Sequence, residues 1–215
     1  MRTRILLSLA ALLFAFSLSA QNNYVGAFFT KPSIETTSET DPDIGRVKLV
    51  FDGKTGYGVS FDHFLSPDTA VHLSWQKLRA GSRIELADQG GGVSIDAGSM
   101  DLNEYTAALH WYFLSPRNMV RPFVGGGIAR IQGAKLHVPA ELTDSGTADE
   151  TFSLDSKTTW TADAGVDINV GTNGAITASV QYTPYKTHFG AAPDDPVQFM
   201  KVNPTTFAAG FRWRF

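Results

Sequence analysis

The segment FAAGFRWRF, residues Phe207–Phe215, is the most informative part of the chain. Its alternate positions carry aromatic side chains or Ala209, and the positions between them are small or charged. A period of two is typical of a β-strand with one apolar face. A soluble protein seldom exposes such an aromatic strand, because an open edge promotes aggregation. In a transmembrane β-barrel the same strand closes the ring while its aromatic face contacts lipid.

The opposite end of the chain predicts export. Residues Met1–Arg4 are basic, Ile5–Phe16 are almost wholly apolar, and Ser17–Ala20 offer small residues for cleavage. This pattern predicts a secretory signal peptide over residues 1–20, because the apolar run is too short to span a membrane. A retained N-terminal helix is the alternative. We expect residues 21–215 to form one transmembrane β-barrel domain.

The composition agrees with a barrel in the outer membrane. After the predicted signal peptide, no apolar run is long enough for a transmembrane helix. Near-neutral mean hydropathy is expected of a barrel, because lipid-facing and lumen-facing residues cancel within each strand. The chain has no Cys, which excludes disulfides and acylation at a cleavage-site Cys. It has no basic stripe, so we expect no nucleic-acid partner.

Alternating segments separated by turn residues predict eight strands. The expected ranges are 23–31, 54–64, 70–86, 102–113, 121–136, 156–169, 175–189 and 202–215. Three connections are short, and four are long and polar, near 32–53, 87–101, 137–155 and 190–201. Short periplasmic turns that alternate with long extracellular loops are typical of bacterial barrels. We therefore predict an all-β fold, an eight-stranded antiparallel transmembrane β-barrel of the outer-membrane type with both termini on the periplasmic side.

The phase of the alternation predicts which residues face lipid. The expected outward sets are Tyr57, Val59, Phe61; Val71, Leu73, Trp75; Tyr105, Ala107, Leu109, Trp111, Phe113; Trp160, Ala162, Ala164, Val166, Ile168; and Ile176, Ala178, Val180, Tyr182. No acidic residue falls on these faces, which fits the cost of placing charge against lipid. Gly125–Gly127 interrupt the segment 121–132, where we expect Phe123, Ala129 and Ile131 to face outward. The two faces of residues 24–31 cannot be distinguished.

The opposite phase predicts the residues that line the lumen and form a candidate ligand path. They are His72, Ser74, Gln76, Glu104, His110, Arg130, Asp163, Asp167 and Gln181. One interpretation is a charged constriction in a pore. The other is that inward charges, Arg212 and Arg214 included, pair with one another and fill the barrel. We favour pairing, because eight strands enclose only enough room for side chains and unpaired buried charges are costly.

Aromatic residues on the outward face predict a membrane-interface girdle more readily than ligand stacking. The expected girdle residues are Trp75, Trp111, Phe211, Trp213 and Phe215. Phe215, with Trp213 two residues before it, also resembles the assembly signal of bacterial outer-membrane barrels. That resemblance implies the barrel assembly machinery as a partner.

The remaining candidate motifs do not predict chemistry. A barrel deacylase needs a Ser-His-acid set near the outer surface. His63 and His110 lie at the periplasmic end, and no Ser and carboxylate are placed beside His188. The His and Asp residues lack compact metal-ligand spacing, and no Lys-Ser/Thr follows the glycine run. We expect no enzyme activity, no metal and no cofactor.

Three segments, taken in order, resemble the OmpW family of small outer-membrane barrels. They are the hairpin Leu109–Phe113 through Arg121–Gly127, the strand Trp160–Asp167, and the ending Val202–Phe215. The resemblance implies an eight-stranded barrel in a Gram-negative outer membrane, with lipid and lipopolysaccharide around it. It also implies passive uptake of small hydrophobic molecules through an apolar interior with a lateral exit. Because the expected inward positions are mostly polar, a second hypothesis stays open: a non-transporting barrel whose acidic loops serve envelope integrity or surface contacts.

Overall fold

The computed structural model describes residues 23–34, 37–41, 45–88, 91–138, 150–153, 156–189 and 198–215. The predicted signal peptide lies outside these residues. The barrel wall consists of β1 (Asn23–Ser33), β3 (Gly45–Phe64), β4 (Thr69–Asp88), β5 (Gly91–Tyr112), β6 (Val120–Val138), β8 (Lys157–Val170), β9 (Gly174–Tyr182) and β12 (Thr205–Arg214). The short strands β2 (Thr37–Asp41) and β7 (Glu150–Ser153) pair with β3 and β6, respectively. β10 (Tyr185–Phe189) and β11 (Gln198–Val202) pair only with each other. The described residues include no helix able to cross a membrane.

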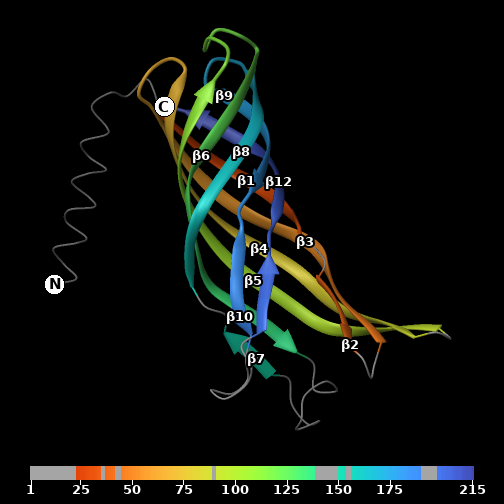
Figure 1. Ribbon diagram of the computed structural model, residues 1–215. Helices are drawn as coiled ribbons and strands as arrows, with labels where there is room; N and C mark the ends of the chain where they lie inside the picture. The colour runs from red at the N-terminus through yellow and green to blue at the C-terminus, as the bar shows by residue number, and fades with distance from the viewer. Residues whose placement is uncertain are drawn as a thin grey trace, which may run out of the picture.

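The first and last wall strands close the ring. Tyr24 of β1 lies opposite Arg214 of β12 on one side and opposite Asp62 of β3 on the other. At the seam the backbone N–H of Phe215 donates to the carbonyl oxygen of Asn23 at 3.1 Å. The eight wall strands therefore form a closed antiparallel barrel (Figure 1), as the sequence predicted.

The three short turns, residues 65–68, 113–119 and 171–173, lie at the same end of the barrel as the C terminus, at the top of Figure 1. In the first turn the Ser66 hydroxyl donates to the Asp68 carboxylate, which lowers the pKa of this exposed group. This is the end that we expect to face the periplasm. The positions of the short connections agree with the sequence prediction.

The predicted loops at 87–101 and 32–53 are mostly strand, so those predictions were wrong. β4 and β5 pair from Thr69 opposite Trp111 to Asp88 opposite Gly91 and project to the lower right of Figure 1. Their polar residues pair across strands, as in the contact of 2.8 Å between Lys77 Nζ and Asp101 Oδ2. The polar composition of this segment therefore indicates that β4 and β5 continue as paired strands beyond the part of the wall that has an apolar outer face.

The two faces of most strands follow the predicted phase. Leu109, Trp111 and Phe207 are exposed on the outer wall, and their neighbours in sequence face inward. In β1 the structure resolves the ambiguity, because Gly26 and Thr30 are buried.

Strand β6 has the opposite phase from the predicted one. Phe123, Ala129 and Ile131 are buried in the interior, whereas Val124 and Ile128 are exposed outside. The three glycines carry no side chain that shows the phase, and the pairing of Gly125 with Asp163 of β8 sets it instead.

Buried apolar side chains fill both ends of the interior. We call the set near the short turns the inner aromatic cluster: Tyr24, Phe64, Ala70, Tyr112 and Phe123. We call the set near the far ends of the strands the outer apolar cluster: Ile34, Phe51, Leu78, Ala80, Met100, Leu102, Ile131 and Tyr185. The polar interior residues lie between these two clusters.

Candidate functional site

A cavity of about 40 Å³ lies inside the barrel between the two clusters. Its lining includes the predicted lumen residues His72, Ser74, Gln76, His110, Asp163 and Gln181. A cavity of this size holds a few water molecules, at roughly 10–15 Å³ each. It is far smaller than a pocket for a drug-sized molecule, roughly 300–1,000 Å³.

The other predicted lumen residues divide into two groups. Glu104 and Asp167 are buried in the interior beside the cavity. Arg130 is exposed on the outer wall, so its assignment to the lumen was wrong. It shares the inverted phase of β6 and lies opposite the outward-facing Tyr105.

A charged centre joins β3, β8 and β12 through Arg212. Its Nη1 atom donates to Asp167 Oδ2 at 2.7 Å and to the Tyr112 hydroxyl at 2.8 Å. Its Nη2 atom forms an ion pair with Asp62 Oδ2. Gly26 of β1 makes room for the aliphatic part of the Arg212 side chain, because a Cβ at residue 26 would lie 3.1 Å from Arg212 Cγ. The buried charges are therefore paired, as predicted for a narrow barrel.

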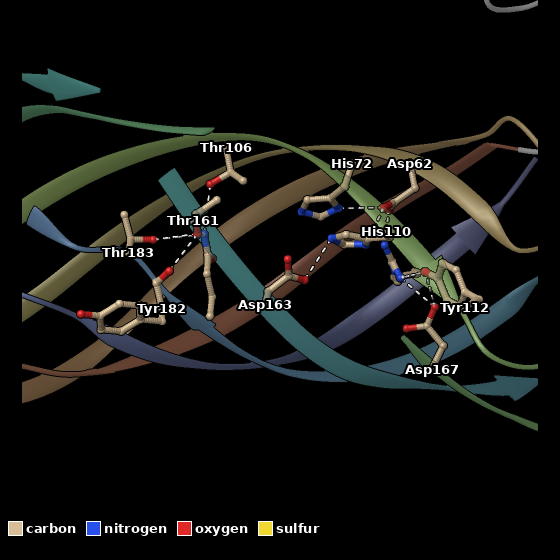
Figure 2. Close-up of polar contacts among 12 residues, drawn as sticks. Asp62, His72, Thr106, His110, Tyr112, Thr161, Asp163, Asp167, Tyr182 and Thr183 are labelled. Carbon is tan, nitrogen blue, oxygen red and sulfur yellow. Dashed lines mark hydrogen bonds and ion pairs between the residues drawn. The ribbon is translucent and has the colours of Figure 1, made fainter. Parts of the chain in front are cut away.

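Two stacked histidines lie beside this centre (Figure 2). His72 Nδ1 is 2.7 Å from Asp62 Oδ1, and His110 Nε2 is 3.0 Å from Asp163 Oδ2. The ring centroids are 4.3 Å apart, with an angle of 17° between the planes. Gly125 pairs with both His110 and Asp163, and a Cβ on it would collide with both side chains.

A polar layer centred on Glu104 separates the cavity from the outer apolar cluster. Glu104 Oε1 accepts hydrogen bonds from Gln181 Nε2 at 2.7 Å and from Thr183 Oγ1 at 3.2 Å. Gln181 Oε1 accepts in turn from Gln76 Nε2 at 3.0 Å. The layer links β4, β5 and β9, and the Thr161 hydroxyl adds β8 through its contact with Thr183 at 2.9 Å.

Arg121 closes the interior at the short-turn end. It is buried, and it donates to the carbonyl oxygens of Pro67 at 2.9 Å and Leu114 at 3.3 Å. Its guanidinium carbon lies 4.3 Å from the centre of the Tyr112 ring, a cation–π geometry. Arg214, which the sequence also placed inward, instead donates to the Thr172 carbonyl in a neighbouring turn.

Asp62 and Arg212 form the middle of this arrangement, but they were not included in the candidate ligand path predicted from the sequence. Their inward phase was visible in the sequence. What the sequence does not show is the register that brings Asp62 opposite His72 and Arg212 within reach of Asp167.

The geometry agrees with a comparison against protein families. The profile described as "Outer membrane protein beta-barrel domain" matches residues 8–215. The chain belongs to this outer-membrane β-barrel family. It is therefore an outer-membrane barrel of the Gram-negative type, and the predicted resemblance to small outer-membrane barrels is confirmed.

Solved structures share the fold of this outer-membrane β-barrel. OprG from Pseudomonas aeruginosa aligns with a TM-score of 0.63 at 15% identity, over 91% of this chain and 96% of that chain. AlkL, solved in DMPC lipid bilayers, aligns at 0.56 with 17% identity, over 91% and 90%. Neisserial surface protein A aligns at 0.52 with 16% identity, over 90% and 97%. A search of curated proteins finds no match.

Proposed function

We propose that this barrel is a passive uptake protein of the OmpW type, which admits small apolar molecules into its outer half and releases them sideways. The outer apolar cluster is the observation that carries this proposal. It places side chains such as Leu78, Met100 and Leu102 inside the barrel, where the sequence led us to expect mostly polar groups. An apolar interior at this end provides a favourable environment for an apolar solute.

The pairing of the wall supports a sideways exit near this cluster. β9 pairs with β8 only as far as Tyr182 opposite Ala162. Among the strands that the structure describes, none pairs with residues 158–161 of β8 on that side, and β10 pairs only with β11. At this level Pro184 separates β9 from β10, and Pro204 separates β11 from β12. Proline interrupts a strand because it has no N–H to donate. A solute could pass here without breaking backbone hydrogen bonds of the wall.

The interior argues against passage along the barrel axis. Between the outer apolar cluster and the short turns lie, in succession, the Glu104 layer, the charged centre and Arg121. Moving an apolar solute through them would break buried polar contacts, which is costly. We therefore assign the lumen residues, such as Ser74 and Gln181, to bracing the barrel and not to the solute path.

Uptake of the apolar fluorophore N-phenyl-1-naphthylamine by cells tests the proposal. Ala80→Phe fills the outer apolar cluster and should slow uptake several-fold, whereas the outward-facing control Ala178→Phe should not. Ser74→Phe blocks the axis and should leave the rate unchanged. The variants are compared with wild type at equal surface amounts. Equal uptake by cells with and without the wild-type protein contradicts the proposal.

The filled interior favours a second candidate, a non-transporting barrel that serves envelope integrity or surface contacts. Equal uptake in the experiment above would support it. Under both candidates we propose lipid and lipopolysaccharide as surroundings and the barrel assembly machinery as a partner. We also propose that neither function involves catalysis, because in the described residues His72 and His110 contact carboxylates and not a serine hydroxyl.

A further inference from the structure

We propose that Asp62, His72 and His110 form a binding site for a divalent transition-metal ion inside the barrel. One carboxylate oxygen and two imidazole nitrogens of these residues lie within 4.8 Å of one another. In Figure 2 the three side chains converge from adjacent strands of the wall. This site is independent of the proposed uptake path, which lies beyond the Glu104 layer.

The distances between the ligand atoms suit a small ion. Bonds of about 2.1 Å in a tetrahedral site separate neighbouring ligand atoms by roughly 3.4 Å. The separations from Asp62 Oδ1 are 2.7 Å to His72 Nδ1 and 3.9 Å to His110 Nδ1, on either side of that value. Because the two rings are stacked with only 17° between their planes, one ring must turn for both in-plane nitrogen lone pairs to meet a single ion.

His110 provides an independent indication of a ligand. Its side chain is 2% exposed, and both of its ring nitrogens are buried without a hydrogen bond. One of them, Nε2, faces Asp163 Oδ2 at 3.0 Å. Histidines that bind metals almost always present the second ring nitrogen to a carboxylate or carbonyl, which orients the ring. The Asp163–His110 pair therefore leaves Nδ1 directed toward the proposed ion.

The local charge also favours a divalent cation. Asp62, Asp163 and Asp167 carry three negative charges, and Arg212 carries one positive charge, so two negative charges remain when the histidines are neutral. Protonating both histidines is the alternative, but it would place two positive rings in a stack only 4.3 Å apart. Arg212 does not block the site, because it contacts Oδ2 of Asp62 and leaves Oδ1 to the histidines.

The donor set selects the class of ion. Two imidazoles and one carboxylate suit Zn²⁺ and its late first-row neighbours better than Mg²⁺ or Ca²⁺. The cavity of about 40 Å³ touches His72 and His110 and has room for a water as a fourth ligand. When the ion binds His72 Nδ1, the proton that this nitrogen shares with Asp62 moves to Nε2 of the same ring, so the histidine remains neutral.

Metal content after refolding tests the site. Tag-free full-length mature protein is refolded in detergent with Zn²⁺, dialysed against metal-free buffer, and analysed by mass spectrometry, with folding checked by heat-modifiable gel mobility. Wild type should retain one Zn²⁺ per chain, and the His72→Gln and His110→Gln variants should lose it. Asp163→Asn should weaken binding about 10–100-fold. His63→Gln, at the inner end beside Asn23, is the matched control and should retain the ion.

Wild type that keeps no more Zn²⁺ than the His72→Gln/His110→Gln double variant would overturn the proposal, as would equal loss in His63→Gln. If the cluster variants do not fold, the wild-type protein alone decides. Co²⁺ should then develop d–d absorption bands of an imidazole-containing site that Zn²⁺ removes. Absence of these bands would also overturn it.

Discussion

His110 and Asp163 contact each other across Gly125, although their strands, β5 and β8, do not pair with one another. His110 Nε2 and Asp163 Oδ2 are 3.0 Å apart, and Gly125 of β6 is the cross-strand neighbour of both residues. The contact exists because this glycine has no side chain. Gly125 therefore contributes to the organisation of the interior.

Gly125→Ala should destabilise the folded barrel by about 1–3 kcal/mol, because the new Cβ would collide with both side chains. Urea unfolding of protein refolded in lipid vesicles measures the change. Gly126→Ala is the matched control: that Cβ would meet only the Thr161 carbonyl oxygen, at 3.8 Å, and should cost little. Equal effects of the two substitutions would contradict this account of the contact.

Arg212→Met should cost roughly 3–5 kcal/mol of folding free energy, because it leaves the buried carboxylates of Asp62 and Asp167 without their cation. The same unfolding measurement applies. Arg214→Met serves as control and should cost only about 0.5–1.5 kcal/mol, the value of the hydrogen bond to Thr172. A loss no larger than that of the control would show that the pairing is not stabilising the barrel.

Leu73→Arg should make insertion less favourable by about 2–4 kcal/mol if the residue lies at the bilayer midplane. Leu73 is 46% exposed on the outer wall, whereas its neighbour Ser74 lines the cavity. Single cysteines at the two positions report their facing directly, since the native chain has none. Labelling of a cysteine at 73, but not at 74, by a water-soluble reagent would reverse the assignment.

Deleting Phe215 should reduce the amount of barrel inserted in cells more than it reduces refolding in detergent. The side chain is exposed, so its loss removes little packing, while the strand that it ends forms the seam with β1. Outer-membrane fractionation and heat-modifiable mobility, measured side by side, separate assembly from folding. Phe113→Ala, another exposed outward aromatic, is the control and should insert normally.

The sequence predicted the barrel because lipid imposes a simple rule on every strand. Alternation alone placed Leu109, Val180 and Phe211 outside and Gln76 inside. The rule failed at β6, where glycines erase the phase and Phe123 is buried with the inner aromatic cluster. It also failed for the long hairpin of β4 and β5, because strands beyond the bilayer need no apolar face.

The candidate site was harder to predict than the wall. Inward facing is a property of one strand, but a contact such as Arg212 with Asp167 depends on the register of several strands at once. The same holds for Asp62, His72 and His110, which come from three strands and show no compact spacing in the sequence.

The outer apolar cluster was missed for several reasons. Ile34, Phe51 and Met100 lie in segments that were expected to be loops, and Ile131 was expected to face lipid. The other members of the cluster lie in predicted strands, but the sequence prediction assigned them to neither face: Leu78, Ala80, Leu102 and Tyr185.

Because β1 pairs with β12, the same barrel can form from a chain in which the strands follow one another from a different starting point. Asn23 and Phe215 are joined by a backbone hydrogen bond, so in a variant that starts at Asn23 a short linker between these residues would give a continuous ring of chain. New termini could then be opened in any of the short turns, for example at 65–68. Such a circular permutant keeps every pairing of the wall but places the aromatic strand in mid-sequence. The closed barrel therefore does not require the chain to begin at β1 and end at β12.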